Sequence, residues 1–204
     1  MVRKVDPAKY EEKRAEILEA ADRCFARHGF HGATIAEICA EAKISPGHLY
    51  HYFETKESII AAIAGSGLEY ARSRSAQILD GSNPINALVS ELELLNTRHK
   101  QTGPGVLLDV LAEAGRDPTV GKILEENSSS MRELLAEFLR KGQTSGQIDP
   151  DLDTDTAAAV LLSLIDGSKA LSIRAPHLDE KKRSKVLEQM ITRFLSPPSR
   201  TANG

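Results

Sequence analysis

The residues with the clearest binding chemistry stand on one short predicted helix that begins after Ser45 and Pro46. With about 100° of rotation per residue, a glycine, two imidazoles and a phenol share the arc opposite the apolar residues Leu49 and Phe53. These outward residues are Gly47, His48, Tyr50 and His51. Each either lets a polar surface approach closely or exchanges hydrogen bonds with it. The pattern predicts a binding face; a solvated face with half-packed rings is the alternative.

Two helix-start signals position this face. Thr34 and Glu37 have the spacing of a capping box, in which each side chain accepts a hydrogen bond from the other residue's backbone N–H. Apolar residues then recur at helical spacing as far as Ala42, and the pattern breaks at Lys43. Ser45 followed by proline is a second start signal. Two short helices at a tight turn are typical of a helix-turn-helix, whose second helix reads base edges in the major groove.

Over residues 10–60 the sequence also resembles the N-terminal domain of TetR-family transcriptional regulators. The residues that carry the resemblance agree in order and spacing without gaps: Arg14, Ile17, Leu18, Ala20, Ala21, Phe25, Gly29, Thr34, Ile38, Cys39, Ala40, Ala42, Ile44, Ser45, Gly47, Leu49, Tyr50, Tyr52, Phe53, Lys56 and Glu57. The resemblance implies a three-helix DNA-binding domain in which Thr34, Tyr52 and Lys56 hold phosphates.

The predicted contacts with DNA divide between bases and backbone. We expect His48 and His51 to read base edges, Gly47 to let the backbone come close, and Tyr50 to contact a phosphate or a thymine methyl group. The predicted DNA-binding residues are Thr34, Ser45, Pro46, Gly47, His48, Tyr50, His51, Tyr52 and Lys56.

Two positions depart from the family pattern. Lys43 stands where a turn glycine is usual, and Ala33 replaces a frequent second threonine. A positive φ at Lys43 would cost about 1 kcal/mol, because its Cβ crowds the backbone. Both departures favour a lower affinity for DNA and leave the fold intact.

Composition narrows the class of protein. The 204 residues are 41% hydrophobic and contain no tryptophan, so aliphatic side chains must fill the core. The charged N-terminus does not resemble a secretory signal, and the apolar run 157–165 is far shorter than the ~20 residues that cross a bilayer. We therefore expect a cytoplasmic protein without membrane contact. Cys24 and Cys39 fall on inward helix faces, as core thiols do; a redox switch is the alternative.

Net charge does not favour DNA binding. The formal net charge is −3, and residues 1–60 hold nine Lys or Arg against ten Asp or Glu. A basic domain would be the usual electrostatic footprint. Arg3, Lys4 and Lys9 form a candidate arm near the phosphates. We expect modest nonspecific affinity and a shallow dependence on salt.

The remaining sequence predicts helices only, so the expected fold class is all-α with about nine helices. Gly29 and Gly142 are predicted helix stops. The predicted helices span about residues 7–28, 35–42, 46–52, 56–79, 84–103, 104–115, 118–142, 154–172 and 179–196. We expect a helix-turn-helix domain over 1–54, a helical ligand-binding and dimerisation domain over 55–196, and a disordered tail over 197–204.

The last two predicted helices are apolar over unusually wide faces. Such helices must be buried on more than one side, and a second copy packing the same helices would cover them. The stretches RDPTV (116–120), FLRKGQTSGQI (138–148) and DTAAAVLLSLIDGS (155–168) resemble the C-terminal domain of the BetI-like subgroup. The family resemblance implies that the last two helices form a four-helix dimer interface; burial within one chain is the alternative. The predicted interface residues are Val160, Leu161, Leu164, Ile165, Ser168, Val186, Met190 and Phe194.

No catalytic motif accompanies these features. The sequence contains no Gly-x-Ser-x-Gly elbow, His-Glu-x-x-His, Cys-x-x-Cys or phosphate-binding glycine motif. His48 and His51 share one face, but no neighbouring carboxylate or cysteine completes a metal site. We expect no enzymatic activity, no cofactor and no metal.

These observations predict a homodimeric repressor that binds a palindromic operator in double-stranded DNA. A small-molecule effector that prefers the form unable to bind DNA would release it. The candidate ligand-binding residues, which could equally be surface or structural polar groups, are Tyr70, Arg74, Asn96, His99, Asp109 and Glu113. The alternative is an all-helical ligand-binding or scaffolding dimer that has lost DNA binding, which the acidic balance permits.

Overall fold

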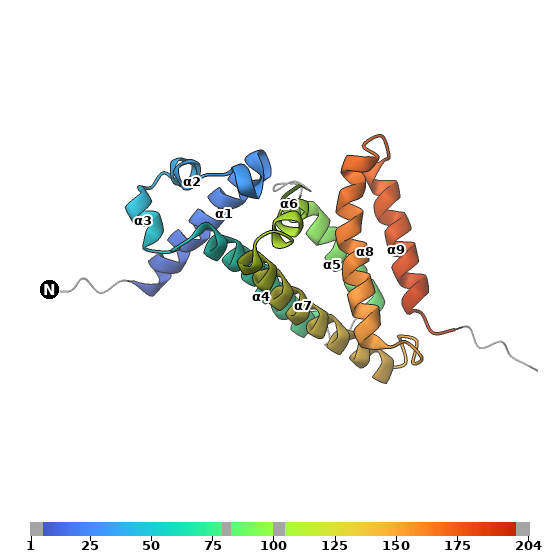
Figure 1. Ribbon diagram of the computed structural model, residues 1–204. Helices are drawn as coiled ribbons and strands as arrows, with labels where there is room; N and C mark the ends of the chain where they lie inside the picture. Colours follow the sequence, from blue (N-terminus) through green and yellow to red (C-terminus); the bar gives the residue numbers. More distant parts are fainter. Residues whose placement is uncertain (1–5, 79–82, 100–104, 199–204) are drawn as a thin grey trace, which may run out of the picture. The chain divides into compact units, whose positions relative to one another are not determined.

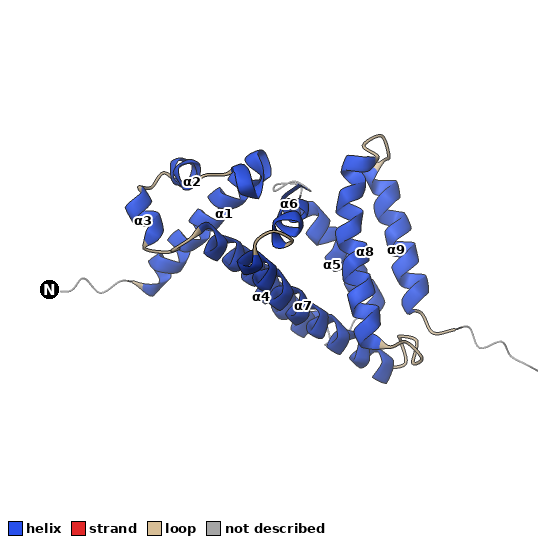
Figure 2. Ribbon diagram, in the orientation of Figure 1, coloured by secondary structure: helices blue, strands red, loops and turns tan. Residues whose placement is uncertain are grey.

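The structure, a computed structural model, describes residues 6–78, 83–99 and 105–198, and every regular element within them is a helix (Figure 1, Figure 2). The predicted all-α class is therefore confirmed. The helices are α1 (Pro7–Gly32), α2 (Ile35–Ala42), α3 (Pro46–Tyr50), α4 (Lys56–Ile78), α5 (Pro84–His99), α6 (Gly105–Ala114), α7 (Pro118–Thr144), α8 (Thr154–Arg174) and α9 (Glu180–Leu195).

Polar side chains cap several helices where the sequence predicts a start. Asp6 accepts a hydrogen bond from the backbone of α1, and Thr34 forms the complete capping box of α2. Ser45, Asp153 and Asp179 cap α3, α8 and α9 in the same way. Each cap satisfies an N–H that the first turn of a helix leaves without a partner.

Two glycines predicted as helix stops have other roles. Gly29 takes φ 72° and ψ 165°, which kinks α1, and one more helical turn follows to Gly32. Helix α7 continues through Gly142 to Thr144. A Cβ on Gly142 would overlap with the Ile148 side chain, so this glycine permits a close approach and does not end the helix.

The chain forms two compact units. The first contains α1, α2, α3, α4 as far as Gly67, α6, and α7 as far as Glu126. The second contains the rest of α4, α5, the rest of α7, α8 and α9. This division differs from the expected boundary at residue 54, because α6 and the first turns of α7 belong with the helix-turn-helix.

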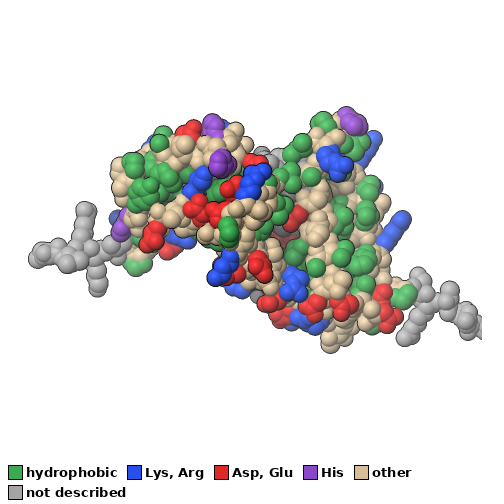
Figure 3. All heavy atoms as spheres, in the orientation of Figure 1, with side chains coloured by type: hydrophobic (Ala, Val, Ile, Leu, Met, Phe, Trp, Pro, Cys, Tyr) green, Lys and Arg blue, Asp and Glu red, His purple; other side chains and the backbone are tan. Residues whose placement is uncertain are grey.

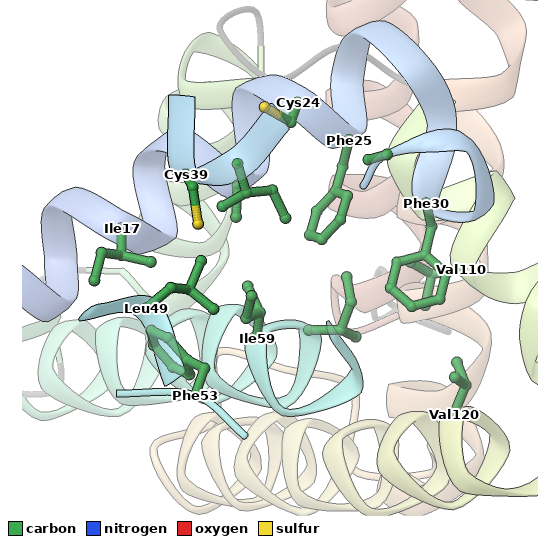
Figure 4. Packing of buried hydrophobic residues seen from close by; sticks show 14 residues of the cluster. Ile17, Cys24, Phe25, Phe30, Cys39, Leu49, Phe53, Ile59, Val110 and Val120 are labelled. Carbon is green, nitrogen blue, oxygen red and sulfur yellow. The ribbon is translucent and has the colours of Figure 1, made fainter. Parts of the chain in front are cut away.

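The hydrophobic core of the first unit explains why α6 and the first turns of α7 belong to it. Leu49 and Phe53 point inward, as predicted, and pack in one cluster with residues of α1, α2 and α4 (Figure 4). Val110 of α6 and Val120 of α7 are buried in the same cluster. The small helix-turn-helix thus completes its apolar core with side chains that lie far along the sequence.

Both cysteines are buried in this core. Burial raises the pKa of the Cys24 and Cys39 thiols, and the nearby Arg27 guanidinium opposes only part of the shift at Cys24. A cysteine reacts as its thiolate, so neither residue has the exposed, electropositive setting of a reactive thiol. The prediction of core thiols is confirmed.

The second unit has a separate core. Ile85 of α5, Leu139 of α7, Leu161 of α8 and both Ile191 and Leu195 of α9 are buried there together. Among the described residues, no helix combines the length and apolar character that a membrane span requires.

Candidate nucleic-acid interface

Helix α3 presents the outward face that the sequence predicts. Gly47, His48 and His51 are exposed, and Tyr50 is 52% exposed. A Cβ on Gly47 would meet no atom within 4 Å, so another surface can approach the backbone there. Leu49, on the opposite side, is fully buried and fixes which face remains outside. The face offers imidazole nitrogens and a phenolic hydroxyl to an incoming polar surface.

The turn before α3 sets where this face begins. Lys43 adopts φ 54° and ψ 45°. This is the left-handed conformation with positive φ in which the Cβ of a lysine crowds the backbone. The next residue, Ile44, donates its N–H to the Cys39 carbonyl at 3.0 Å, which closes the end of α2. Ser45 then accepts from the His48 N–H at 3.3 Å, so the chain starts α3 directly after the turn.

An aromatic cluster supports α3 from the side of α1. Tyr10 stacks on Tyr52 with ring centroids 4.6 Å apart and meets His51 edge-on at 5.9 Å. Tyr52 also lies 5.5 Å from the His48 ring and 5.3 Å from the His51 ring. Tyr10 is not among the residues predicted from the sequence, although it precedes Ile17 by seven residues and so continues the inward stripe of α1.

Thr34, a predicted phosphate contact, uses its hydroxyl within the chain. The hydroxyl donates to Glu37 Oε2 at 2.9 Å, and the Thr34 backbone N–H donates to the same oxygen at 2.8 Å. These bonds, the backbone one first, hold the pKa of Glu37 below its usual range. A phosphate bound by this hydroxyl would have to replace a carboxylate.

Lys56, another predicted phosphate contact, is engaged more completely. Its ammonium donates to the carbonyl oxygens of Phe30 at 2.8 Å, Ala33 at 3.2 Å and His31 at 3.3 Å. The same nitrogen lies 4.6 Å from the centroid of the Phe30 ring. An ammonium has three N–H groups, and all three have partners here. Lys56 thus caps the end of α1, and its contact with a phosphate stays a prediction.

Other cations of this unit are also neutralised internally. Arg23 and Arg27 of α1 both pair with Glu41 of α2, with 2.8 Å between Arg23 Nε and Glu41 Oε1. Hydrogen bonds from Arg27 and Arg23 lower the pKa of Glu41. This pairing joins α1 to α2 and leaves less free positive charge for a phosphate backbone.

The structure brings two of the predicted ligand-binding residues together in the second unit. Arg74 Nε donates to Glu91 Oε1 at 2.6 Å, and the Tyr70 hydroxyl donates to Glu91 Oε2 at 3.4 Å. The Glu91 side chain is only 12% exposed. Glu91 was not predicted as a site residue, because its partners lie on another helix. The side chains of Asn96 and His99 fall outside the described residues.

The other two predicted ligand-binding residues lie on α6, in the first unit. Asp109 Oδ2 is 2.6 Å from the position that a Cβ on Gly29 would take. Glu113 Oε1 lies 3.9 Å from His31 Nδ1, and Arg116 approaches the other oxygen at 3.7 Å. Both carboxylates thus face the end of α1, whereas the described candidates Tyr70 and Arg74 belong to the second unit.

The predicted dimer residues on α8 and α9 differ in exposure. Val160, Val186, Met190 and Phe194 are between 42% and 55% exposed. Apolar side chains cover much of α8 and α9 on the face shown in Figure 3. Leu164, Ile165 and Ser168 are half-buried, whereas Leu161 is 2% exposed. Leu161 fills the core of its own unit, so its predicted contact with a partner does not fit the structure.

Two protein-family models match the chain. Residues 17–63 match the model described as "Bacterial regulatory proteins, tetR family". Residues 93–196 match the model for the C-terminal domain of BetI-type transcriptional repressors. The first match contains α2, α3 and the start of α4, and the second contains α6 to α9.

Individual proteins show the same likeness. The HTH-type transcriptional regulator UidR of Escherichia coli K12 is 34% identical over 155 residues, which are 76% of this chain and 78% of UidR. The HTH-type transcriptional repressor KstR2 of Mycolicibacterium smegmatis is 29% identical over 73% of this chain and 74% of its own. The solved structure of Salmonella enterica GusR aligns with a TM-score of 0.73 and 29% identity, covering 90% of this chain and 95% of GusR.

Proposed function

The chain belongs to the TetR family of bacterial transcriptional regulators, and from that premise we propose that it is a homodimeric repressor released from a palindromic operator by a small molecule. As a member of this family it is a DNA-binding regulator and not an enzyme. Members of the family bind DNA operators and small-molecule effectors and form dimers. For this chain we propose three finer features: the palindromic operator, the dimer interface and the effector site.

The outward face of α3 is the observation that carries the proposal. A buried leucine holds the helix from behind while Gly47, His48, Tyr50 and His51 stay exposed. A recognition helix needs this arrangement, because its first residues must reach base edges without losing their support. His48 and His51 then read the edges of the bases. The helix is fixed against the sugar–phosphate backbone of the DNA by Ser45, Pro46, Tyr50 and Tyr52.

A second copy of the chain would supply the second recognition helix. The exposed apolar residues Val186, Met190 and Phe194 on α9, with Val160 on α8, support a two-fold interface between identical surfaces. A dimer that reads one side of a duplex places its recognition helices about 34 Å apart, which is one turn of DNA. The operator is accordingly expected to be a palindrome.

Release by a ligand follows from differential binding. A molecule that binds better to a form with the wrong spacing of recognition helices shifts the population away from DNA. The polar cluster of Tyr70, Arg74 and Glu91 in the second unit is a candidate for contacting such a molecule, since Glu91 is largely buried. The scaffold that has lost DNA binding is not favoured, because the helix-turn-helix region itself matches its family model.

A genome-wide selection of bound DNA fragments tests the proposal. We expect one enriched palindrome, and a copy beside the protein's own gene would indicate the pathway of the effector.

His48→Ala should cost about 1–3 kcal/mol of binding free energy at one base position and relax the preference for that base. His177→Ala, which removes an exposed histidine of the second unit, is the matched control. An unchanged preference in His48→Ala, or no enriched sequence for the wild type, would contradict the assignment.

A further inference from the structure

We propose that α4 and α7 bend at two short stretches, residues 65–67 and residues 127–130, and that the two compact units reorient about them as rigid bodies. Both helices pass from one unit into the other, and these crossing stretches lie where they do so. The proposal concerns the chain itself, and only its consequence for DNA rests on the proposed function.

The two hydrophobic cores leave the crossing stretches between them. The core of the first unit includes Ile59 and Ile63 of α4 and reaches Ile123 on α7, whereas the core of the second unit begins on α7 at Leu135. Among the described residues, no side chain of α4 after Ile63 belongs to either core, and none of α7 between Ile123 and Leu135 does. Helical segments with few buried apolar contacts open at lower free energy than segments packed in a core.

The two glycines of α4 are not required by packing. A Cβ on Gly65 or Gly67 would meet no atom of the described residues within 4 Å beyond its own stretch of helix. Gly142 differs, because a Cβ there would overlap with Ile148. Glycine inside a helix is less stable than alanine, since it loses more backbone freedom on folding. The pair therefore weakens α4 at the crossing without any gain in packing.

Ser66, between the two glycines, weakens the helix in a second way. Its hydroxyl donates to the carbonyl oxygens of Ala62 at 3.0 Å and Ile63 at 2.9 Å. A serine hydroxyl that bonds back to the preceding turn slightly destabilises a helix and often bends it. Glycine and serine pairs are also one of the few recurrent causes of sharp helix kinks. The Gly-Ser-Gly sequence thus favours bending of α4 at this point.

The crossing stretch of α7 has the same character without glycine. Residues 127–130 read Asn-Ser-Ser-Ser, and such side chains compete with the helix for backbone hydrogen bonds. The sequences on either side, KILEE over 122–126 and MRELL over 131–135, consist mostly of strong helix formers. Both helices that join the units therefore contain weak helix formers where they cross.

Bending at the two crossing stretches would leave each core intact and change what the dimer presents to DNA. Helix α3 belongs to the first unit, and α8 and α9 belong to the second. In the proposed dimer, which α8 and α9 hold together, bending changes the distance between the two copies of α3. Operator binding needs a distance of about 34 Å, so a ligand that favours another bend would weaken it.

Three variants of the full-length protein test the proposal. Gly65→Ala combined with Gly67→Ala strengthens α4 at its crossing stretch, and Ser128→Ala combined with Ser130→Ala strengthens α7. Gly167→Ala is the matched control, because it makes the same change inside α8, where a Cβ also meets no atom of the described residues within 4 Å beyond its own stretch of helix.

Two nitroxide labels within one chain report on the bend. Ala26→Cys and Lys185→Cys place them at exposed positions of α1 and α9, one in each unit. The native Cys24 and Cys39 are buried, and protein without the added cysteines shows whether they take up label. Double electron–electron resonance on labelled protein diluted with unlabelled protein then gives the distribution of distances within one chain. Hydrogen exchange over residues 62–69 and 125–132 measures local opening.

We expect a broad distance distribution for the wild type and a narrower one for each paired variant. Exchange over the α4 stretch should slow by about fivefold for each glycine replaced, and the serine pair should slow exchange over the α7 stretch by a smaller factor. Gly167→Ala should slow exchange only in α8 and leave the distance distribution as broad as that of the wild type.

Two results would overturn the inference. One is a distribution of unchanged width in both paired variants although exchange has slowed, because the helices would then be stronger without any loss of motion. The other is a wild-type distribution as narrow as those of the paired variants. The labels lie within one chain, so a monomeric wild type, or one that enriches no DNA fragment, would contradict the proposed function and leave this measurement decisive.

Discussion

At the scale of single residues, the turn between α2 and α3 contains a lysine in a conformation that suits glycine. Lys43 has φ 54°, and in the described part of the chain it is the only residue other than glycine with a positive φ. Its Cβ crowds the backbone there, at a cost of about 1 kcal/mol. The fold keeps this strain because hydrogen bonds on both sides of Lys43 close the turn.

Lys43→Gly should therefore stabilise the protein by up to about 0.5 kcal/mol, because the greater freedom of glycine in the unfolded chain cancels much of the relieved strain. Urea denaturation measures the change. Lys43→Ala is the control, because it removes the charge and keeps the Cβ. An equal gain from both substitutions would mean that charge, and not backbone strain, sets the cost.

Asp22 on α1 makes the stability of the folded protein depend on pH. Burial raises the pKa of this carboxyl to about 6, and the charge of Arg23 opposes only part of the shift. In the unfolded chain the group titrates near its usual value of 3.8. Between these two values the folded state binds the extra proton, so the contribution of Asp22 to stability rises as pH falls through about 6.

We predict that Asp22→Asn raises the free energy of unfolding at pH 7 by about 1–2 kcal/mol, since the carboxyl is only partly shielded from water. The gain should shrink as pH falls below about 6, where the aspartic acid is already neutral in the folded state. Denaturation at pH 5 and pH 7 tests both statements. Glu12→Gln, at an exposed position of the same helix, should show no such pattern.

At the scale of elements, α3 is too short to hold its own orientation. It has five residues, and Leu49 alone of them is buried. Its support comes from α1, where Tyr10 stacks on Tyr52 just beyond the helix and meets the His51 ring. Aromatic pairs of this kind contribute about 0.5–1.5 kcal/mol beyond the area that they bury.

Tyr10→Leu should consequently lower stability by about 1 kcal/mol and weaken operator binding at all sequences alike. Tyr10→Phe keeps the ring and should stay close to wild type in both respects. Thermal denaturation and operator titration provide the readouts. If the phenylalanine variant behaved like the leucine variant, the hydroxyl group and not the stacked ring would be responsible.

At the scale of the whole molecule, the exposed stripe on α9 is what a second subunit would cover. Val186, Met190 and Phe194 recur every four residues beside the buried Ile191 and Leu195, so one helix has an inner and an outer apolar face. A face of this width is costly in water unless another surface covers it.

Met190→Glu should shift the protein from dimer to monomer in analytical ultracentrifugation, because it places a charge within the proposed apolar contact. Gln189→Glu adds the same charge on the polar side of α9 and should leave the dimer intact. Operator affinity should fall together with dimerisation. A Met190→Glu variant that stays dimeric would place the interface elsewhere.

The sequence by itself determined the features that depend on neighbours along the chain. The capping box of Thr34, the start at Ser45 and the outward face of α3 all follow from residues within four positions of each other. Local hydrogen bonds and helical periodicity act over this range, so they can be read without a fold.

Only the tertiary structure decided which distant partner each side chain finds. Periodicity placed Leu161 on an apolar face but did not show that its own unit covers it. Lys56 sits 26 positions from its carbonyl acceptor Phe30, and Glu91 sits 17 from Arg74. Such contacts depend on how helices pack in space, and helical spacing specifies the face that is buried without specifying what buries it.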